Sequence, residues 1–520
     1  MESTSQSSSS HIVSPLWRPT LIVFVSNVCV MVLELVAGRI IAPYVGVSLY
    51  TWTSVIGVVL AGLSLGNYLG GRLADRWASL RLLGGVFLLG GLFSLGILAA
   101  DALSLRLPDA WPVVGRILAF TAALFFVPSV ILGAVSPMVV KLAVSDLART
   151  GSTVGRISAA GTVGSIVGTF ATGFWLISQF GTHIIVLSVS IVLLGMAAVF
   201  LLSGARRPVQ ASLLALAALM MSAGVFFISG RGWLKSPCHL ETNYFCIKVR
   251  EEDQGGETVR VLILDRLVHS YTSLTNPKKL VYGYEQVYAE ATEYQARRRQ
   301  PLAALFIGGG GYTFPRYMEA VYPGSRLDVI EIDPGVTQTA YELLGLSPDS
   351  GVLSFNEDAR MFFKRPPTRS YDLIMGDAFN DYSVPYHLTT HEFNERVRAW
   401  LTPDGLYMVN MIDGPRRDFL RAYIYTLRQT FAHVYLAPAV RAWRSSPRVT
   451  FVLIASNAAL DLAEFATIDA GDGETFFADQ ALDESEVAAI LEEKRVVALT
   501  DRYAPIDQML APVFRGEQAP

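Results

Sequence analysis

The sequence predicts two architectures in one chain, a multi-pass α-helical membrane domain followed by an α/β domain built on a doubly wound sheet of parallel strands. Three observations predict this division. The 520 residues are 52% hydrophobic and only 17% charged, which is more apolar than an ordinary soluble protein of this size. Nearly all of that excess precedes about residue 230. Beyond it, short apolar runs alternate with amphipathic stretches, and one run ends in four consecutive glycines.

The membrane domain is predicted over residues 19–230. Residues 1–18 begin with a serine-rich stretch, lack the basic region of a signal peptide and are expected to be disordered. A membrane-spanning helix needs about 20 mostly apolar residues. Seven runs meet this length, and small residues are frequent inside them, as close helix packing in lipid favours. The predicted spans are residues 20–42, 50–72, 82–100, 117–140, 157–179, 182–203 and 211–230.

The loops between these spans predict an orientation, because lysine and arginine mark cytoplasmic loops. The loops after the second, fourth and sixth spans carry eight such residues, and the opposite loops carry three. We therefore expect a cytoplasmic amino terminus in a bacterial inner (plasma) membrane. Seven spans then place everything after Arg231 on the outer face. The eight residues are Arg72, Arg76, Arg81, Lys141, Arg149, Arg156, Arg206 and Arg207, and the three are Arg39, Arg106 and Arg116.

Two features of the membrane half point towards transport. Glu34 lies inside the first predicted span, where an ionisable residue is costly and is therefore a functional candidate. A carboxylate paired with Arg39, or with a hydroxyl of a neighbouring helix, is an equally good interpretation. The sequence GGRLADR, residues 70–76, resembles the loop between the second and third helices of major facilitator transporters. This motif is short and is weak evidence by itself.

The remainder of the chain predicts two sheets and a tail. Residues 231–290 alternate like antiparallel hairpin strands and predict a small β-subdomain. Residues 291–460 alternate strands with helices, which predicts a Rossmann-like nucleoside-binding domain. Residues 461–520 form a carboxyl-terminal tail that we expect to be ordered, without an assigned mechanism. The predicted strands of the larger sheet contain AALFI, RLDVI, GVLSF, YDLIMG, GLYMVNMID, HVYLAPAV and RVTFVLIAS.

Three features at the ends of successive predicted strands indicate an adenine nucleoside ligand. Gly308–Gly310 follow the first strand and allow a ligand to approach the backbone. Glu331 ends the second strand, where a carboxylate can accept both ribose hydroxyls. Asp358 follows the third strand, where a carboxylate can meet the adenine amino group. No G-K-[ST] sequence follows the glycines, which argues against a nucleoside triphosphate.

Charge and cysteine content exclude other classes of partner. The net charge of −3 predicts that the chain does not bind nucleic acid. The three cysteines have no metal-ligand spacing, so we expect no metal. Cys29 lies in an apolar run and is expected to pack there. Cys238 and Cys246 flank a short segment and could pair, but only in an oxidising compartment.

These strand ends resemble those of the spermidine synthases, a branch of the class I S-adenosylmethionine-dependent methyltransferase fold. The segments IGGGGYTFPRY, VIEID, NEDARMFF and DLIMGDAF carry the resemblance. LETNYFCIKV and LILDRLVHSY resemble the amino-terminal β-subdomain of that family. The resemblance covers about residues 238–460. The whole chain is similar to bacterial proteins in which a major-facilitator-like membrane domain is fused to a spermidine synthase.

The resemblance implies an enzyme that moves an aminopropyl group from decarboxylated S-adenosylmethionine to a small-molecule amine such as putrescine, and it implies a homodimer. Asp377 ends the fourth strand and would be the general base; a loop or helix-capping carboxylate is the alternative. The residues implied to bind the nucleoside are Gly308, Gly309, Gly310, Glu331, Asp358 and Ala359. The residues implied to bind the amine substrate are Tyr244, His269, Tyr284, Asn380 and Asp381.

Four positions depart from the family pattern, all on the side that recognises amines. Gly311 and Asn380 stand where the family has aspartates, and Phe245 and His269 stand where it has glutamines. Three alternatives therefore stay open. One is cleavage of S-adenosylmethionine itself to methylthioadenosine, the second is a transporter whose carboxyl domain senses or delivers a nucleoside or polyamine, and the third is a lipid acceptor in the bilayer. An external domain also conflicts with a donor made in the cytosol.

Overall fold

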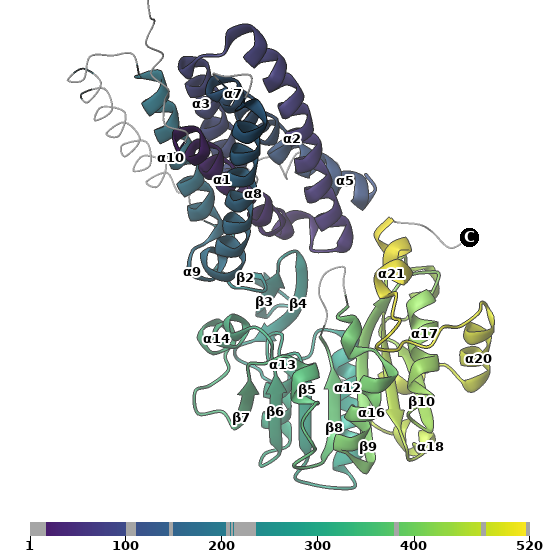
Figure 1. Ribbon diagram of the computed structural model, residues 1–520. Coiled ribbons are helices and arrows are strands. Elements are labelled where there is room, and N and C mark those ends of the chain that lie inside the picture. The colour runs from purple at the N-terminus through teal and green to yellow at the C-terminus, as the bar shows by residue number, and fades with distance from the viewer. Residues whose placement is uncertain are drawn as a thin grey trace, which may run out of the picture. The chain divides into compact units, whose positions relative to one another are not determined.

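The structure is a computed structural model that describes residues 17–99, 111–144, 149–203, 236–378, 384–469 and 475–515, together with the single residues 209 and 212. The chain divides into two compact units (Figure 1). One unit comprises Met1–Ile41, Thr51–Asp109 and Arg116–Ser236, and the other comprises Pro237–Pro520 with the short segments Ala42–Tyr50 and Ala110–Gly115.

The first unit contains five helical segments that are long and apolar enough to cross a membrane, which indicates a multi-pass membrane protein. They correspond to the first, second, fourth, fifth and sixth predicted spans. The five segments are Trp17–Val45, Leu49–Trp77, Val114–Ala143, Thr150–Gln179 and Thr182–Leu201. Their helices are α1 (Trp17–Val45), α2 (Leu49–Trp77), α5 (Val113–Thr121), α6 (Val127–Gly133), α7 (Val135–Ala143), α8 (Thr150–Ala171), α9 (Ile177–Gln179) and α10 (Thr182–Leu201). Two π-helical turns, Ala122–Phe126 and Thr172–Leu176, interrupt the third and fourth of these five segments.

The third and seventh predicted spans differ from the other five. The third is observed as α3 (Leu80–Gly96), an apolar helix of 17 residues that a 3₁₀ turn, Ile97–Ala99, continues. Its α-helical part is shorter than the ~20 residues that a spanning helix needs. The seventh, residues 211–230, lies outside the described residues except for Ser212.

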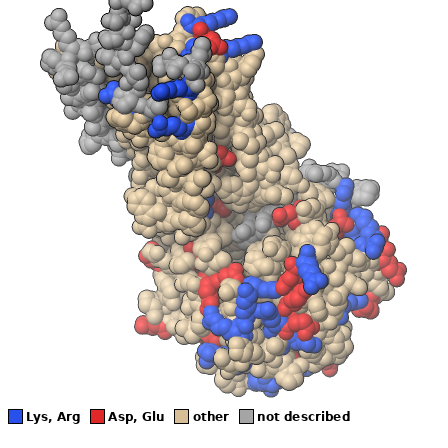
Figure 2. Space-filling model, viewed as in Figure 1, with Lys and Arg blue, Asp and Glu red and all other residues tan. Residues whose placement is uncertain are grey.

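Close helix packing explains the small residues of this unit. A Cβ built on Gly66 of α2 would lie 2.1 Å from the carbonyl oxygen of Val130, and one on Gly164 of α8 would lie 2.4 Å from that of Phe24. Glycine is required at both positions because the neighbouring backbones occupy the space of a side chain. On the face shown in Figure 2, charged side chains are sparse over the body of this unit, as expected for a surface in contact with lipid.

An ion pair agrees with the predicted orientation of the helices. Nζ of Lys141, near the end of α7, lies 3.0 Å from Oδ1 of Asp75, near the end of α2. The loops that follow the second and fourth predicted spans therefore lie on the same side of this unit, as alternate crossings require. The pair is exposed, so it contributes little to stability.

The second unit begins with a small antiparallel sheet, which confirms the predicted β-subdomain. Its strands follow the order of the sequence, and each pairs with the next. They are β1 (Leu240–Glu241), β2 (Cys246–Asp253), β3 (Thr258–Leu264) and β4 (Leu267–Ser273). A disulfide joins Cys238, before β1, to Cys246 at the start of β2.

A seven-stranded sheet follows, in the order β10-β11-β9-β8-β5-β6-β7. All seven predicted strands are observed, and β5 to β9 are parallel. The sheet is mixed, because β10 and β11 form a hairpin whose strands are antiparallel to each other and whose second strand is antiparallel to β9. The strands are β5 (Ala303–Ile307), β6 (Arg326–Ile330), β7 (Val352–Phe355), β8 (Tyr371–Gly376), β9 (Leu401–Asp413), β10 (His433–Pro438) and β11 (Val449–Ser456).

Helices cover both faces of this sheet, so it has a core on each side (Figure 1). Along β5, Leu305 and Ile307 enter one core while Ala304 and Phe306 enter the other, as the alternation of side chains along a strand requires. The helices are α12 (Gly283–Ala296), α13 (Thr313–Val321), α14 (Pro334–Leu343), α15 (Ala359–Phe362), α16 (His391–Trp400), α17 (Asp418–Leu427), α18 (Leu462–Phe465), α19 (Phe476–Gln480), α20 (Glu484–Glu492) and α21 (Ile506–Arg515). A doubly wound sheet with helices on both faces is the predicted Rossmann-like architecture.

The order of the strands determines where a ligand can bind. The chain runs outward from β5 through β6 to β7, then returns to the other side of β5 as β8. The carboxyl ends of β5 and β8 therefore flank the point at which the direction of winding reverses. Open α/β sheets bind ligands in the crevice at this point.

Candidate active site

The four glycines after β5 have different structural roles. Gly308 has φ of +97°, and a Cβ built on it would lie 2.4 Å from the carbonyl oxygen of Asp377 at the end of β8. A Cβ on Gly309 would lie 2.6 Å from the ring of Tyr312. Gly310 has φ of +48° and no atom within 4 Å of the place of its Cβ. Chain packing thus requires the first two glycines, and Gly310 is the one of these three that leaves open space for a ligand.

Gly311 explains the first departure from the family pattern. A Cβ built on it would lie 1.9 Å from Oγ of Ser270 and 2.9 Å from Oγ1 of Thr272, both on β4. Contacts this short are not tolerated, so the small sheet leaves no room for an aspartate at this position. Glycine therefore stands here in place of the family's aspartate because β4 packs closely against the glycine turn.

Glu331, which follows β6, is oriented by two backbone groups. Its Oε2 accepts a hydrogen bond of 2.8 Å from the Gly309 amide, and its Oε1 accepts one of 2.9 Å from the Asp333 amide. The side chain is buried, and burial raises the pKa of Glu331 to about 7, against the effect of these amide donors. Each carboxylate oxygen can accept a further hydrogen bond. The predicted contact with a ribose hydroxyl is compatible with this geometry.

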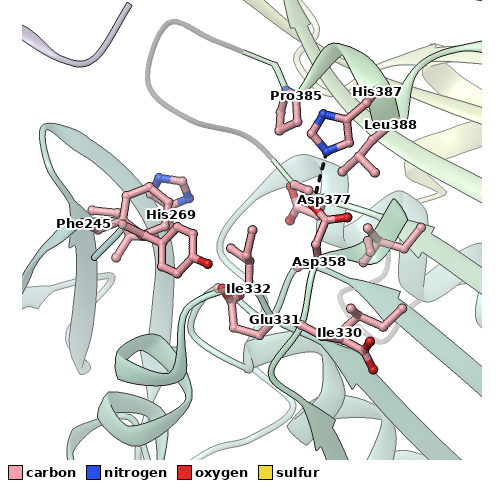
Figure 3. Close-up of a pocket in the computed structure, with 18 residues that line it drawn as sticks. Phe245, His269, Ile330, Glu331, Ile332, Asp358, Asp377, Pro385, His387 and Leu388 are labelled. Atoms are coloured by element: carbon pink, nitrogen blue, oxygen red, sulfur yellow. Dashed lines mark ion pairs between the residues drawn. The ribbon is translucent and has the colours of Figure 1, made fainter. Parts of the chain in front are cut away.

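Asp358 is held at the start of α15. Its Oδ1 accepts a hydrogen bond of 3.0 Å from the Met361 amide and so caps this helix. Its Oδ2 lies 3.4 Å from Nε2 of His387, the pair joined by the dashed line in Figure 3. The sequence predicts an adenine contact for Asp358. In the structure its carboxylate lines the cavity and also caps α15.

Five of the six predicted nucleoside residues, all except Gly309, line one cavity of about 150 Å³ (Figure 3). Glu331, Asp358 and Asp377 approach it from the ends of three strands, and Pro385, His387 and Leu388 form the wall beside Asp358 and Asp377. Apolar side chains separate the acids. The lining also includes Tyr244, Phe245, Leu264, His269, Ile307, Gly308, Gly310, Ile330, Ile332, Glu357, Ala359 and Ala378.

Asp377 has a hydrogen-bond donor on each carboxylate oxygen. The Tyr284 hydroxyl donates to Oδ2 at 3.0 Å, and Nδ2 of Asn410 donates to Oδ1 at 2.8 Å. Burial raises the pKa of Asp377 above its usual range, while these two donors lower it. A raised pKa brings a carboxylate closer to the range in which it can accept a proton from an amine.

A smaller cavity of about 30 Å³ adjoins the larger one, and Gly308, Gly310, His269 and Asp377 line both. Within the described residues, neither Nε2 of His269 nor Oγ of Ser270 has a hydrogen-bond partner, although both are buried. Burial, with a smaller effect from Arg448, lowers the pKa of His269 to about 4, so its imidazole is neutral at pH 7. A small polar group bound in this cavity could form hydrogen bonds with these two atoms.

Of the residues predicted to bind the amine, Tyr284 contacts Asp377 directly, and His269 lines the same two cavities as Asp377. Tyr244 lies at the larger cavity with 42% of its surface exposed. Asn380 and Asp381 lie outside the described residues.

No protein-family model matches the chain. The chain is 35% identical over 113 residues to a polyamine aminopropyltransferase of Vibrio vulnificus, covering 21% of this chain and 38% of that protein. It is 25% identical over 210 residues to the polyamine aminopropyltransferase of Chromobacterium violaceum, covering 39% of this chain and 75% of that protein. Among solved structures, the chain matches a probable spermidine synthase from Corynebacterium glutamicum with 23% sequence identity and a TM-score of 0.42. The match covers 48% of this chain and 93% of that one.

The carboxyl half of the chain is a domain of the spermidine synthase/polyamine aminopropyltransferase family. It follows an amino-terminal region of several apolar helices, and the resemblance of the carboxyl half to this family is confirmed. The chain spans 38% and 33% of the length of the first two curated relatives that it matches. Its activity, substrates and partners are therefore proposals.

Sequence reasoning missed the contact of Asn410 in this aminopropyltransferase-family domain, and it placed Glu285 beside Tyr284, near the acceptor-binding motif of the family, without assigning it a contact. Asn410 lies on β9 within the apolar run GLYMVNMID, and a polar residue in a buried strand was an available signal. Glu285, on the first turn of α12, accepts a hydrogen bond of 3.2 Å from the Tyr282 amide. Burial, together with the nearby charge of Asp377, raises the pKa of Glu285 to about 8. Its position relative to Asp377 follows from the fold and could not be deduced from spacing.

Proposed function

We propose that the carboxyl-terminal domain transfers an aminopropyl group from decarboxylated S-adenosylmethionine to a primary amine, putrescine or a related acceptor, with Asp377 as the general base. The observation that carries this proposal is the position of Asp377. Its half-buried carboxylate lines the same cavity as Glu331 and Asp358, and two neighbouring side chains fix both of its oxygens. The donor nucleoside would occupy the larger cavity, with Glu331 at the ribose and Asp358 with Ala359 at the adenine.

The chemistry requires a base at this place. The electrophile is the methylene carbon bonded to the positively charged sulfur. The lone pair of the amine forms the new C–N bond while the C–S bond breaks, and the electrons of that bond pass to sulfur, which leaves as neutral methylthioadenosine. A primary amine with a pKa of about 10 is protonated at pH 7, so it must lose a proton before it can react. Asp377 accepts that proton.

The remaining contribution of the domain is orientation. Tyr284 and Asn410 hold the Asp377 carboxylate at the junction of the two cavities, so the acceptor nitrogen and the donor carbon meet beside the base. Holding two reactants in line replaces a bimolecular encounter with a nearly unimolecular step.

One observation favours a second reaction at the same site. Among the described residues that line the smaller cavity, the acids are Asp377 and Glu285, and Gly311 has no space for a third. A diamine carries two positive charges and favours several carboxylates. In an intramolecular cleavage of S-adenosylmethionine, the carboxylate of the donor forms a C–O bond to the methylene carbon bonded to sulfur while the C–S bond breaks. The products are methylthioadenosine and a lactone, so this reaction needs no external amine and would make use of such a site.

The disulfide supports a location for this domain. Disulfides persist in oxidising compartments and are rare in the cytosol. The Cys238–Cys246 bond therefore supports a domain on the outer face of a plasma membrane, as the distribution of basic residues predicts.

Turnover by the purified full-length protein in detergent tests the function. Decarboxylated S-adenosylmethionine with putrescine should yield spermidine and methylthioadenosine, detected by mass spectrometry. Asp377→Asn should lower this rate by about 10² to 10⁴. Asp349→Asn, an exposed acid on a surface loop, is the matched control and should retain the rate. Methylthioadenosine formed from S-adenosylmethionine without an amine would support the second reaction, and no product from either donor would contradict both.

A further inference from the structure

Residues 499–501 of the carboxyl-terminal segment pack along the start of α16. The Leu499 side chain is fully buried, and the Leu499 carbonyl accepts a hydrogen bond of 2.8 Å from the His391 amide. The Asp501 amide donates one of 2.9 Å to Oε2 of Glu392. These bonds fix the backbone of the segment on either side of its turn. They place the Asp501 side chain next to the wall of the nucleoside cavity.

Asp501 contacts two residues that support different parts of this wall. Its Oδ2 forms an ion pair with the Arg360 guanidinium, and its Oδ1 accepts a hydrogen bond of 2.7 Å from the Thr390 hydroxyl. Arg360 directly follows Ala359, which lines the cavity. Thr390 caps α16 and comes shortly after the cavity residue His387. One carboxylate thus joins the two segments that form the adenine end of the cavity.

Arg360 completes the connection. Its Nη1 donates hydrogen bonds of 3.0 Å to the carbonyl oxygen of His387 and 3.1 Å to the Thr390 hydroxyl. Only 12% of the Arg360 side chain is exposed, so water can replace few of these partners. Within the part of the chain that the structure describes, this guanidinium without the Asp501 carboxylate would have no opposite charge among its hydrogen-bond partners. Charged groups that lose their partner in a partly buried site tend to rearrange.

We propose that Asp501 is a positioning residue for the donor nucleoside: it holds Arg360, and through Arg360 the backbone of His387, in the arrangement that shapes the cavity wall. This inference rests on the nucleoside site proposed above. It gives the carboxyl-terminal segment a role in binding, although none of the described residues of this segment lines the cavity. The imidazole of His387, which lies 3.4 Å from Asp358, keeps its place over the cavity through the same contacts.

Calorimetric titration of the full-length protein with methylthioadenosine tests the proposal. Asp501→Asn keeps the shape of the side chain and removes its charge. It should raise the dissociation constant about tenfold, as expected when a charge-assisted hydrogen bond of ~1.5 kcal/mol is lost. The KM for the donor should rise by a similar factor, while kcat at saturating donor should stay within about twofold, since Asp501 touches neither Asp377 nor the cavity. Asp501→Glu should restore most of the affinity.

Glu484→Gln provides the matched control. Glu484 belongs to the same carboxyl-terminal segment and forms an exposed ion pair with Arg428, far in sequence from the cavity wall. This variant should bind methylthioadenosine as the parent does. Equal affinity of Asp501→Asn and the parent, or an equal loss in Glu484→Gln, would overturn the proposal. If Asp501→Asn fails to fold, Arg360→Lys tests the same contact, because a lysine cannot make the forked set of bonds and should lose a similar affinity. A parent protein that binds no methylthioadenosine would instead reject the nucleoside site itself.

Discussion

The Tyr284 hydroxyl lies 3.0 Å from Oδ2 of Asp377 and donates a hydrogen bond to it. Burial raises the pKa of Tyr284 well above its ordinary value, so the hydroxyl stays protonated and acts as a donor throughout the working range of pH. A donor to the ionised form of a carboxyl lowers its pKa, and burial of Asp377 acts in the opposite direction. The balance of these effects determines the pH at which Asp377 becomes a base.

Tyr284→Phe should therefore move the pH–rate profile. Loss of the donor raises the pKa of Asp377 further, so the carboxylate forms at higher pH and the rising limb of the profile shifts upward. The shift should be about one pH unit, since a hydrogen bond to a charged group is worth ~1.5 kcal/mol and one pKa unit ~1.4 kcal/mol. Initial rates between pH 5 and 9 measure it. Tyr435→Phe on β10, whose oxygen accepts a hydrogen bond from the Leu460 amide, is the control and should leave the limb in place.

Gly308→Ala should damage the junction between β5 and β8. Its Cβ would have to occupy a point 2.4 Å from the Asp377 carbonyl oxygen, and its φ of +97° is unfavourable for alanine. We expect a loss of at least ~2 kcal/mol in stability and no detectable turnover. Gly324→Ala has a similar φ of +83° but open space around its Cβ, so it isolates the cost of the backbone conformation. Thermal unfolding in detergent measures both, and equal losses would show that the contact with Asp377 is unimportant.

The strands of the fold were predictable because apolar runs ending in Gly, Asp or Glu carry a strong local signal. Glu331, Asp358 and Asp377 were also predictable from the local sequence, because each follows a parallel strand and the carboxyl ends of these strands lie at one edge of the sheet. The membrane segments were predictable from the length and hydropathy of their apolar runs. Helix α3 was predicted too long, because an apolar run does not determine where a helix ends.

The roles of individual glycines were not predictable. Gly308, Gly309 and Gly311 are restricted by Asp377, Tyr312 and Ser270, and two of these three neighbours lie about 40 to 70 positions away in the sequence. Periodicity and spacing contain no information about such contacts. The contacts of Asp501 with Arg360 and Thr390 were not predictable either, because they form only when the distant carboxyl-terminal segment packs against α16.

Glu285→Gln should change how stability depends on pH. Burial raises the pKa of Glu285 to about 8 in the folded protein, compared with an ordinary value of 4.5. The folded state therefore binds this proton more tightly than the unfolded state does. The associated stability is present below about pH 4.5 and is lost as pH rises towards 8. Glutamine can still accept the hydrogen bond from the Tyr282 amide and has no proton to lose. The variant should thus gain a few degrees in Tm relative to the parent between pH 5 and 8.

Parallel thermal scans of parent and variant at pH 5, 6.5 and 8 measure this effect. Glu257→Gln is a useful control, because hydrogen bonds from Ser273, Lys279 and Thr275 lower the pKa of Glu257 instead. Its effect on Tm should not grow as pH rises from 5 to 8. A constant difference in Tm between parent and Glu285→Gln across the three values would contradict the assignment of Glu285 as a proton-binding group of the folded state.

The Cys238–Cys246 disulfide predicts which side of the membrane the aminopropyltransferase-family domain occupies. In intact bacterial cells that produce the full-length protein, a membrane-impermeant maleimide should label neither residue until an impermeant reductant has been added, because both sulfurs are in the bond. A Cys29→Ala background removes the third cysteine, which is buried in α1. Labelling after external reduction places the domain outside, where its donor must cross the membrane. Free thiols that react only after the cells are opened would place it in the cytosol, where the donor is made, and would then require an even number of crossings before β1. With a cytoplasmic amino terminus, the same measurement therefore shows whether the chain crosses the membrane an odd or an even number of times before β1.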